Sequence, residues 1–292
     1  MPGKRLPEWL RKKDPIRREM MTTRNLLKGL NLNTVCENAR CPNIGECYSR
    51  DTATFMILGR NCTRSCRFCA VSSQEPEPVD PAEPNHLAQA VIRLDLEHVV
   101  ITSVTRDDLP LGGAKQFVRV IQAVRAAKPE VTLEILTPDF KLREEAVNMI
   151  AEAEPEIFNH NIETVPALYE KVRPEADYHR SLKLLKMIGE KTENTVIKSG
   201  LMLGLGENRD ELRKVWDDLV EFGCQVLTMG QYLQPTSANL PVDEYIKPEK
   251  FDELKEEAIS YGFKKVIAGP YVRSSYLAEE TTPHLLSGGG EA

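Results

Sequence analysis

The sequence predicts an α/β protein with a parallel sheet, and three observations support this fold class. From about Thr52 onward, short apolar and β-branched runs alternate with amphipathic stretches long enough for helices. The runs are almost continuously apolar, as in parallel strands that helices cover. The alternation occurs six times, and helices between such strands imply right-handed crossovers.

The predicted elements follow one another in regular order. The strands are expected at 52–59, 98–104, 131–137, 157–163, 195–204 and 226–233. The helix after each strand is expected at 84–96, 113–128, 143–154, 178–192, 209–223 and 248–262. Six units are too few to close an eight-stranded barrel, so the residues alone leave two architectures open, a curved partial barrel and an open doubly wound sheet.

The length of 292 residues suits one large domain with extensions. We expect a basic N-terminal arm and cysteine segment at 1–47, a core at 48–266, and a C-terminal extension with a flexible tail at 267–292. The arm up to Lys28 carries nine Lys or Arg against three Asp or Glu. Two interpretations of the arm stay open, a solvated tail and a docking surface for an acidic partner.

The composition excludes several classes of protein. It is 41% hydrophobic and 28% charged, as in ordinary globular proteins. No apolar run approaches the roughly 18 residues that span a bilayer, and the basic start lacks the apolar region of an export signal. With a net charge of -6 and one aromatic residue in the arm, nucleic acid is a poor candidate partner. We expect a cytoplasmic protein that binds neither membranes nor nucleic acid.

Six of the seven cysteines form two groups of three. The downstream trio, Cys62, Cys66 and Cys69, follows the first predicted strand, and its spacing fits three corners of an iron-sulfur cube. No histidine lies at ligand spacing to this loop, which disfavours a structural zinc site. Three protein ligands leave one iron open, and an open position usually receives a ligand that comes and goes.

Polar residues accumulate where the predicted strands end. The stretches are "TSVTRDD" at 102–108, "NHNIET" at 159–164, "SGLMLGLGE" at 199–207 and "GQYLQPT" at 230–236. Because the carboxyl ends of parallel strands meet at one rim, the chemistry is expected there.

The downstream trio, with Phe68 before its last cysteine, resembles the signature of the radical S-adenosylmethionine superfamily. The resemblance implies a partial (β/α)6 barrel and a [4Fe-4S] cluster on Cys62, Cys66 and Cys69. It also implies that S-adenosylmethionine binds the open iron and is cleaved to a 5'-deoxyadenosyl radical. Strand-end position and this resemblance together suggest the cofactor contacts Thr102, Ser103, Asn161, Glu163, Lys198 and Ser199.

The upstream trio, Cys36, Cys41 and Cys47, makes the resemblance narrower. Together with "ATFMILG", "RDDLPLGGA", "NHNIETV", "GQYLQPT" and "GPYVRSSY", it is similar to the lipoyl synthase family over residues 35–276. The resemblance implies a second, auxiliary [4Fe-4S] cluster on this trio, with a serine of "RSSY" as fourth ligand. It favours Ser275, the serine next to Tyr276, whereas the residues alone do not separate Ser275 from Ser274.

The implied activity is that of a radical sulfurtransferase. Two sulfur atoms from the auxiliary cluster would be inserted at C6 and C8 of an octanoyl chain on a lysine, C-H bonds that acid-base chemistry cannot reach. The implied partners are octanoylated lipoyl carrier domains (2-oxoacid dehydrogenase E2 subunits and glycine cleavage H protein), a low-potential electron donor and iron-sulfur carrier proteins.

Two alternatives stay open. One is another radical enzyme that inserts sulfur, although the upstream trio together with "RSSY" argues against it. The other is a non-catalytic iron-sulfur electron carrier or scaffold. An electron carrier would need full cysteine coordination to keep its clusters intact, and each trio lacks a fourth cysteine.

Overall fold

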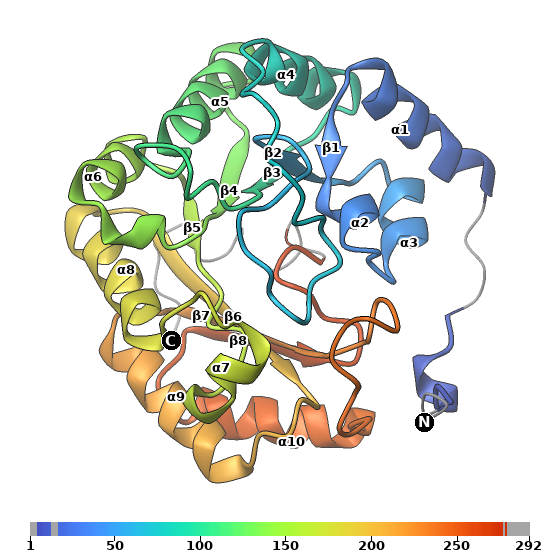
Figure 1. The fold of residues 1–292 in the computed structure, drawn as a ribbon, viewed down its shortest axis with the longest axis vertical. Helices are drawn as coiled ribbons and strands as arrows, with labels where there is room; N and C mark the ends of the chain where they lie inside the picture. Colours follow the sequence, from blue (N-terminus) through green and yellow to red (C-terminus); the bar gives the residue numbers. More distant parts are fainter. Residues whose placement is uncertain (1–4, 13–16, 277, 279–292) are drawn as a thin grey trace.

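The computed structural model describes residues 5–12, 17–276 and 278, and these form an open barrel of strands inside a ring of helices (Figure 1). The strands of this part of the chain make one sheet in sequence order. They are β1 (Asn33–Thr34), β2 (Thr54–Ile57), β3 (His98–Ser103), β4 (Thr132–Leu136), β5 (Ile157–Asn159), β6 (Val196–Leu203), β7 (Val226–Gln231) and β8 (Lys265–Gly269). β1 pairs antiparallel with β2, and all later neighbours pair in parallel.

The six predicted strand-helix units are confirmed. The helices that follow β2 to β7 on the outside of the sheet are α4 (Glu83–Arg93), α5 (Ala114–Ala127), α6 (Glu144–Glu152), α8 (Tyr178–Lys191), α9 (Arg209–Glu221) and α10 (Pro248–Ile259). A doubly wound sheet would carry helices on both faces, whereas these helices form one outer layer (Figure 1). The fold is therefore the partial barrel.

The remaining helical segments lie before the barrel or in its loops. They are η1 (Glu8–Leu10), α1 (Arg17–Gly29), α2 (Val35–Asn38), α3 (Ile44–Ser49), η2 (Phe140–Leu142), η3 (Pro166–Leu168) and α7 (Tyr169–Val172). No helix in the described ranges is long and apolar enough to cross a membrane. Of the basic arm, residues 1–4 and 13–16 lie outside the described residues, as do residues 277 and 279–292 of the predicted C-terminal extension.

The sheet has one parallel strand more than the sequence predicts. β8 pairs with β7 from Val226↔Lys265 to Gly230↔Gly269. Its five residues follow the last predicted helix and lie on both sides of the predicted boundary at 266, so the division of the chain into three segments stays a prediction. β1 and β8 are the two edges of the sheet, and the barrel is open between them.

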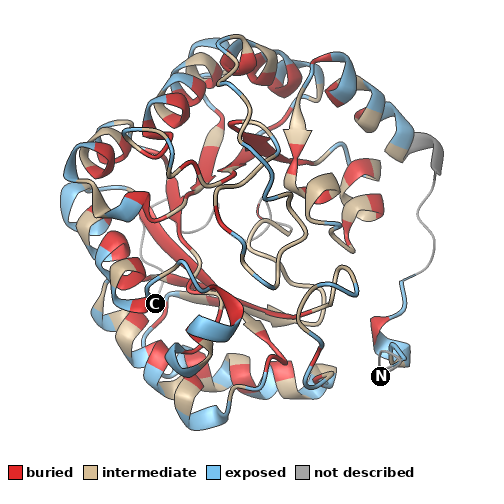
Figure 2. Ribbon diagram, in the orientation of Figure 1, coloured by how far each residue is buried: buried red, intermediate tan, exposed pale blue. Residues whose placement is uncertain are grey.

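The core fills the layer between the sheet and the outer helices (Figure 2). The strand residues Phe55, Ile101 and Phe158 pack in one cluster with helix residues such as Phe117 and Leu185, and all five are fully buried. Capping residues help to fix where helices begin. For example, α9 starts with a capping box between Asn208 and Glu211.

The interior of the barrel contains a buried ionic group. Lys198 Nζ of β6 lies 2.8 Å from Glu134 Oε1 of β4, and both side chains are almost completely excluded from solvent. His98 Nε2 lies 3.3 Å from the other carboxylate oxygen of Glu134, and Asn159 Nδ2 donates to Oε1. Burial opposes ionisation of Glu134, but Lys198 outweighs it and holds the pKa of the carboxyl below its usual value.

Candidate functional site

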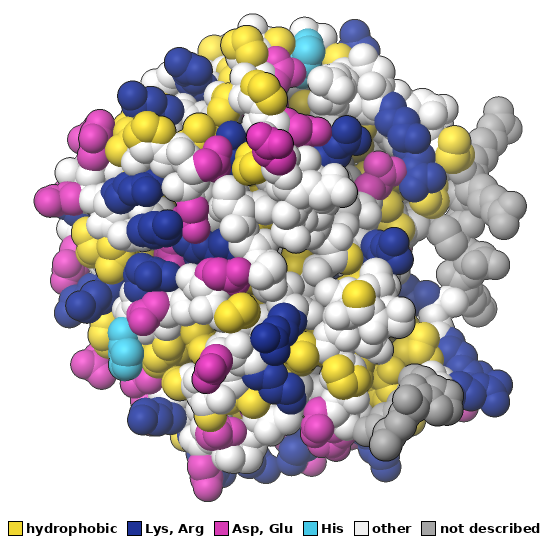
Figure 3. All heavy atoms as spheres, viewed as in Figure 1, with side chains coloured by type: hydrophobic (Ala, Val, Ile, Leu, Met, Phe, Trp, Pro, Cys, Tyr) yellow, Lys and Arg dark blue, Asp and Glu magenta, His cyan; other side chains and the backbone are white. Residues whose placement is uncertain are grey.

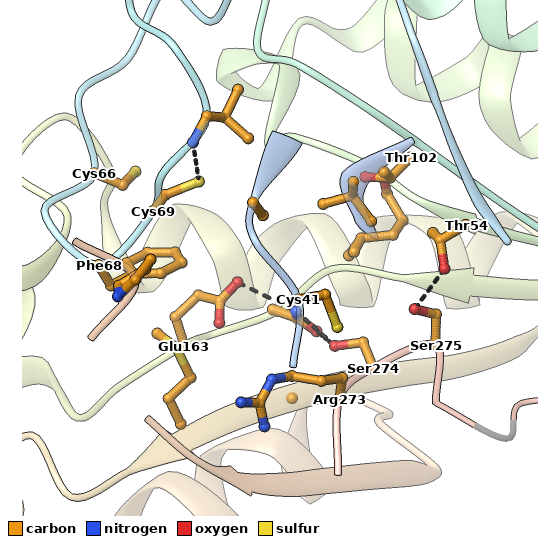
Figure 4. Close-up of a pocket in the computed structure, with 18 of the residues that line it drawn as sticks. Cys41, Thr54, Cys66, Phe68, Cys69, Thr102, Glu163, Arg273, Ser274 and Ser275 are labelled. Carbon is orange, nitrogen blue, oxygen red and sulfur yellow. Dashed lines mark hydrogen bonds between the residues drawn. The ribbon is translucent and has the colours of Figure 1, made fainter. Parts of the chain in front are cut away.

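Both cysteine trios open into one cavity of about 730 Å³ at the carboxyl ends of the strands. Four of the predicted cofactor contacts also line it, namely Thr102, Ser103, Asn161 and Glu163, and so do both serines of the C-terminal segment, Ser274 and Ser275. In Figure 4, Cys66 and Cys69 lie on one side of the pocket and Cys41, Ser274 and Ser275 on the other, with Glu163 between the two groups. These residues therefore meet at the predicted rim of the sheet, and their part in the chemistry stays a prediction.

The loop of the downstream trio is fixed to the barrel by a buried cation. Arg64, between Cys62 and Cys66, places its guanidinium 2.9 Å from Asp107 and 2.6 Å from Asp139. Burial opposes ionisation of Asp139, but the bonds from Arg64 prevail and hold the pKa of that carboxyl well below its usual range. Since Asp107 follows β3 and Asp139 follows β4, two strand ends hold this loop in place.

Backbone bonds hold the same loop from its other sides. Cys62 N donates to Ser72 O at 2.7 Å, and Arg67 N donates to Val172 O at 2.9 Å. Asn239 Nδ2 donates to Cys69 O at 2.8 Å. Protein contacts therefore hold this loop on several sides.

The cysteines of this trio are partly buried, and backbone amides surround two of the sulfur atoms. Backbone N-H groups of Thr105 and Val71 point at Cys62 Sγ and Cys69 Sγ, at 3.3 and 3.4 Å. Burial raises the pKa of Cys66 to about 11 and that of Cys69 to about 12. Without metal these two thiols stay protonated at neutral pH, so a metal that binds there must displace their protons.

The upstream trio lies on the short helices α2 and α3 and on the segment between them, which carries Cys41. Thr34 caps α2, which bears Cys36, and Cys41 N donates to Cys36 O at 3.0 Å. Cys36 is buried, and burial raises its pKa to about 12, while the backbone and hydroxyl of Thr54 contact the thiol and oppose the increase.

The two serines of the C-terminal segment contact different partners. Ser275 Oγ accepts a hydrogen bond of 2.8 Å from Thr54 Oγ1, and Thr54 also contacts Cys36. Ser274 Oγ accepts a bond of 2.7 Å from Asn161 Nδ2, which also donates to Glu163 Oε1 (Figure 4). One serine therefore lies beside the upstream trio, and the other beside the polar residues that follow β5.

The donor set suits clusters better than a single ion. A zinc ion holds sulfur ligands at about 2.3 Å, so its ligands must lie close together. Among the described residues, no three His, Cys, Asp or Glu side chains could hold one metal ion. A four-iron cluster binds each thiolate to a different iron, and two sets of three thiols at one cavity fit two such clusters.

Two of the predicted contacts are not brought to the cavity. β6 runs to Leu203, so Lys198 lies five residues before its end and pairs with Glu134 inside the barrel. Ser199 lies on the opposite face of the strand, and its hydroxyl donates to His160 O at 2.9 Å. We therefore do not propose Lys198 or Ser199 as cofactor contacts.

Sequence reasoning missed two arginines of the cavity wall. Arg173 is buried and donates through Nη1 to Asn161 O and Ile162 O, while its Nε has no hydrogen-bond partner among the described residues. Arg273 also lines the cavity, close enough to Cys41 and Glu163 for its charge to interact with theirs. Arg273 stands inside "RSSY" and could have been chosen from that segment, but nothing in the spacing of the sequence marks Arg173.

Charges on the face of Figure 3 are mixed. Lys and Arg side chains alternate with Asp and Glu over the outer helices. Buried charged side chains lie around the cavity and in the barrel interior.

Comparison with solved structures agrees with this fold. SuiB of Streptococcus suis bound to precursor peptide SuiA has a TM-score of 0.59 at 14% identity, covering 80% of this chain and 53% of that one, so the chain spans about half of that protein. Methylornithine synthase has a TM-score of 0.54 at 13% identity, with 86% and 83% covered. At such low identity these two similarities establish the fold alone.

Comparison of sequences identifies the family. Residues 56–219 match the model of the radical SAM superfamily, and residues 2–41 match that of the N-terminal domain of lipoyl synthase. The lipoyl synthase of Chlorobium phaeobacteroides is 50% identical over 96% of this chain and 97% of its own length. That of Alkaliphilus metalliredigens is 50% identical over 95% and 96%. The chain belongs to the lipoyl synthase family of the radical SAM superfamily.

Proposed function

We propose that the residues of this cavity carry out sulfur insertion at C6 and C8 of a protein-bound octanoyl-lysine, with the sulfur supplied by a cluster on the upstream trio. The observation that carries the proposal is that both trios open into one cavity. A radical centre generated at one side and a sulfur source at the other could then act on the same acyl chain without its release.

The family determines the cofactors, which are two [4Fe-4S] clusters and S-adenosylmethionine. When bound, the downstream cluster and S-adenosylmethionine supply a radical strong enough to remove hydrogen from an unactivated C-H bond. In the proposal, Cys62, Cys66 and Cys69 hold that cluster. It also assigns cofactor binding to four residues, a choice supported by their position in the cavity lining, namely Thr102, Ser103, Asn161 and Glu163.

Arg173 is added to the proposed cofactor site on the ground of its charge. A guanidinium that is buried without an ion-pair partner is costly, and an anionic ligand removes much of that cost. The described residues give Arg173 two carbonyl partners, the ring of Tyr169 at 5.4 Å and the more distant charge of Glu163, and they leave its Nε without a hydrogen bond at the cavity wall. The carboxylate of S-adenosylmethionine has the chemistry that this group can accept.

Ser275 is the proposed fourth ligand of the upstream cluster, beside Cys36, Cys41 and Cys47. Its hydrogen bond with Thr54, which also contacts Cys36, supports this choice over Ser274, whose hydroxyl is bonded to Asn161. A serine oxygen is a harder ligand than a thiolate and binds such iron less well. The bond between Ser275 and its iron is therefore the one expected to break when sulfur leaves the cluster.

The macromolecular substrates are lipoyl carrier proteins. The proposal extends to the E2 subunits of 2-oxoacid dehydrogenases and the glycine cleavage H protein as carriers, and to a low-potential electron donor and iron-sulfur carrier proteins as partners. A cytoplasmic location, where thiols remain reduced, is part of the same proposal.

The test is an anaerobic single-turnover reaction. The chain is reconstituted with iron and sulfide, then mixed with reductant, S-adenosylmethionine and an octanoyl-lysine peptide, and the peptide mass is followed. We expect a gain of two sulfur atoms. Cys36→Ala should still form 5'-deoxyadenosine but insert no sulfur, and retained sulfur insertion in this variant would overturn the assignment of the donor cluster.

A matched pair of variants separates the two serines. Ser275→Ala should lose sulfur insertion and keep cleavage of S-adenosylmethionine, whereas Ser274→Ala should chiefly weaken cofactor binding. If Ser275→Ala inserts sulfur like the unaltered chain while Ser274→Ala does not, the ligand is Ser274. If the unaltered chain forms 5'-deoxyadenosine only with another substrate, the radical class stands and the octanoyl substrate is wrong.

A further inference from the structure

The described part of the N-terminal arm, residues 5–12, is attached to the molecule at two points near the open side of the barrel. Its turn η1 buries Leu10, and Trp9 Nε1 donates to Ile246 O in the loop before α10 at 3.2 Å. Two residues beyond η1, Lys12 reaches the segment that carries the upstream trio. The arm therefore connects the two sides of the barrel opening.

Lys12 contacts both segments that supply the proposed auxiliary ligands. Its Nζ lies 2.6 Å from Asn43 Oδ1 and 2.8 Å from Glu46 Oε2, which stand between Cys41 and Cys47 in the chain. The same ammonium lies over the ring of Tyr271 at 4.4 Å and over that of Tyr276 at 5.3 Å. These tyrosines flank Ser274 and Ser275 on both sides.

The partners of Lys12 also bind one another. Tyr276 donates its hydroxyl hydrogen to Glu46 Oε1 at 2.7 Å, and Asn43 Nδ2 donates to Tyr271 O at 2.8 Å. Lys12 thus stands at the junction of a network that joins residues 43–46 to residues 271–276. None of its contacts in the described part of the chain involves the downstream trio.

We propose that Lys12 is a positioning residue that latches the C-terminal segment onto the upstream trio, and that release of this latch opens the auxiliary site so that its cluster can be replaced. The inference rests on the proposed function, because it needs a cluster on Cys36, Cys41, Cys47 and Ser275. Ser275, the proposed fourth ligand of that cluster, lies on the segment that Lys12 holds.

The chemistry of the contacts suits a latch that opens and closes. The side chain of Lys12 is 27% exposed and that of Glu46 is 40% exposed, so solvent screens their ion pair. Contacts between an ammonium and an aromatic ring at such a site are also individually modest. Together they hold the segment, yet they can separate without disturbing the sheet, whose pairing does not involve them.

The experiment measures iron loss from each cluster separately. One background carries Cys62→Ala, Cys66→Ala and Cys69→Ala and keeps only the upstream site, and the other carries Cys36→Ala, Cys41→Ala and Cys47→Ala. Each is reconstituted as the full chain, and the rate of iron transfer to a chelator is followed anaerobically. In each background Lys12 is left unaltered or replaced by Met, which keeps most of the apolar stem and removes the charge, or by Arg, which keeps the charge.

We expect Lys12→Met to accelerate iron loss from the upstream site about fivefold, the factor that corresponds to losing one modest charged contact. Lys12→Arg should restore most of the slow rate, and the downstream site should be unaffected. Arg11→Met is the matched control, because Arg11 is exposed and its side chain bonds to Leu6 O.

Two outcomes would contradict the role of Lys12 and leave the proposed function intact. In the first, Lys12→Met does not change the rate of iron loss from the upstream site. In the second, both sites lose iron faster to the same degree, as in general destabilisation. A different result contradicts the proposed function. If the background that lacks the downstream trio takes up no iron with Lys12 unaltered, the upstream trio does not hold a cluster.

Discussion

Replacement of Lys198 by Met tests the assignment of this residue to the barrel interior rather than to the cofactor. Lys198 Nζ and Glu134 Oε1 are 2.8 Å apart, with side-chain exposures of 1% and 0%. Met retains most of the apolar stem of Lys198 and removes the charge. The Glu134 carboxylate is then left buried, with His98 and Asn159 as its remaining partners among the described residues.

The expected loss follows from leaving one buried charge without its partner. Breaking such a pair costs about 3–5 kcal/mol of unfolding free energy. At roughly 2 °C per kcal/mol for a chain of this length, the Tm should fall by roughly 6–10 °C. Removing the carboxylate as well, in Lys198→Met with Glu134→Gln, should restore most of the loss, because no buried charge then remains uncompensated.

The assay is thermal unfolding followed by far-ultraviolet circular dichroism, with the clusters reconstituted in every variant. Binding of S-adenosylmethionine is measured in parallel, well below the Tm of the weakest variant. Lys198→Met should bind it like the unaltered chain, whereas Glu163→Gln should bind it more weakly at an unchanged Tm. An unchanged Tm in Lys198→Met combined with a tenfold loss of cofactor affinity would refute the reasoning.

Two further predictions concern His160 and Gly230. Burial and the charge of Arg173 lower the pKa of His160 to about 4, so the unfolding free energy should fall by up to about 3 kcal/mol as the pH drops from about 6.5 to 4. Chemical denaturation at several pH values should show a smaller decrease for His160→Asn, and an equal decrease would contradict the assignment. A Cβ on Gly230 would lie 2.0 Å from Val272 O, so Gly230→Ala should displace the C-terminal segment and lower the iron content by about half, with Gly189→Ala as a neutral control.

The sequence predicts most of the fold because the barrel repeats one pattern. Each buried strand and each amphipathic helix has its own signal, and all six predicted units are present. β8 was missed because its five residues follow the last predicted helix and have no helix after them to mark a further unit. The pairing that makes β8 a strand is with β7, and a single sequence carries no record of pairing.

The sequence indicates which residues reach the rim most accurately where the strand before them is short. Asn161 and Glu163 follow the three-residue β5 directly and line the cavity. Lys198 was misplaced because β6 is eight residues long and the pattern does not show at which residue it reaches the rim. The contacts of Lys12 could not be predicted from the sequence either. Its partners Asn43, Glu46 and Tyr276 are far from it in the chain and come together only in the folded barrel.

The proposed ligands of the upstream cluster lie next to the two edge strands β1 and β8, and they are therefore synthesised at very different times. The upstream trio follows one edge strand and Ser275 follows the other, and 230 residues separate Glu46 from its partner Tyr276. A ribosome delivers the first three ligands long before the fourth, after every strand of the sheet has been synthesised. A cluster bound to all four would span the two edges as a clasp. Coordination by all four ligands could therefore be completed only after the last strand has been synthesised.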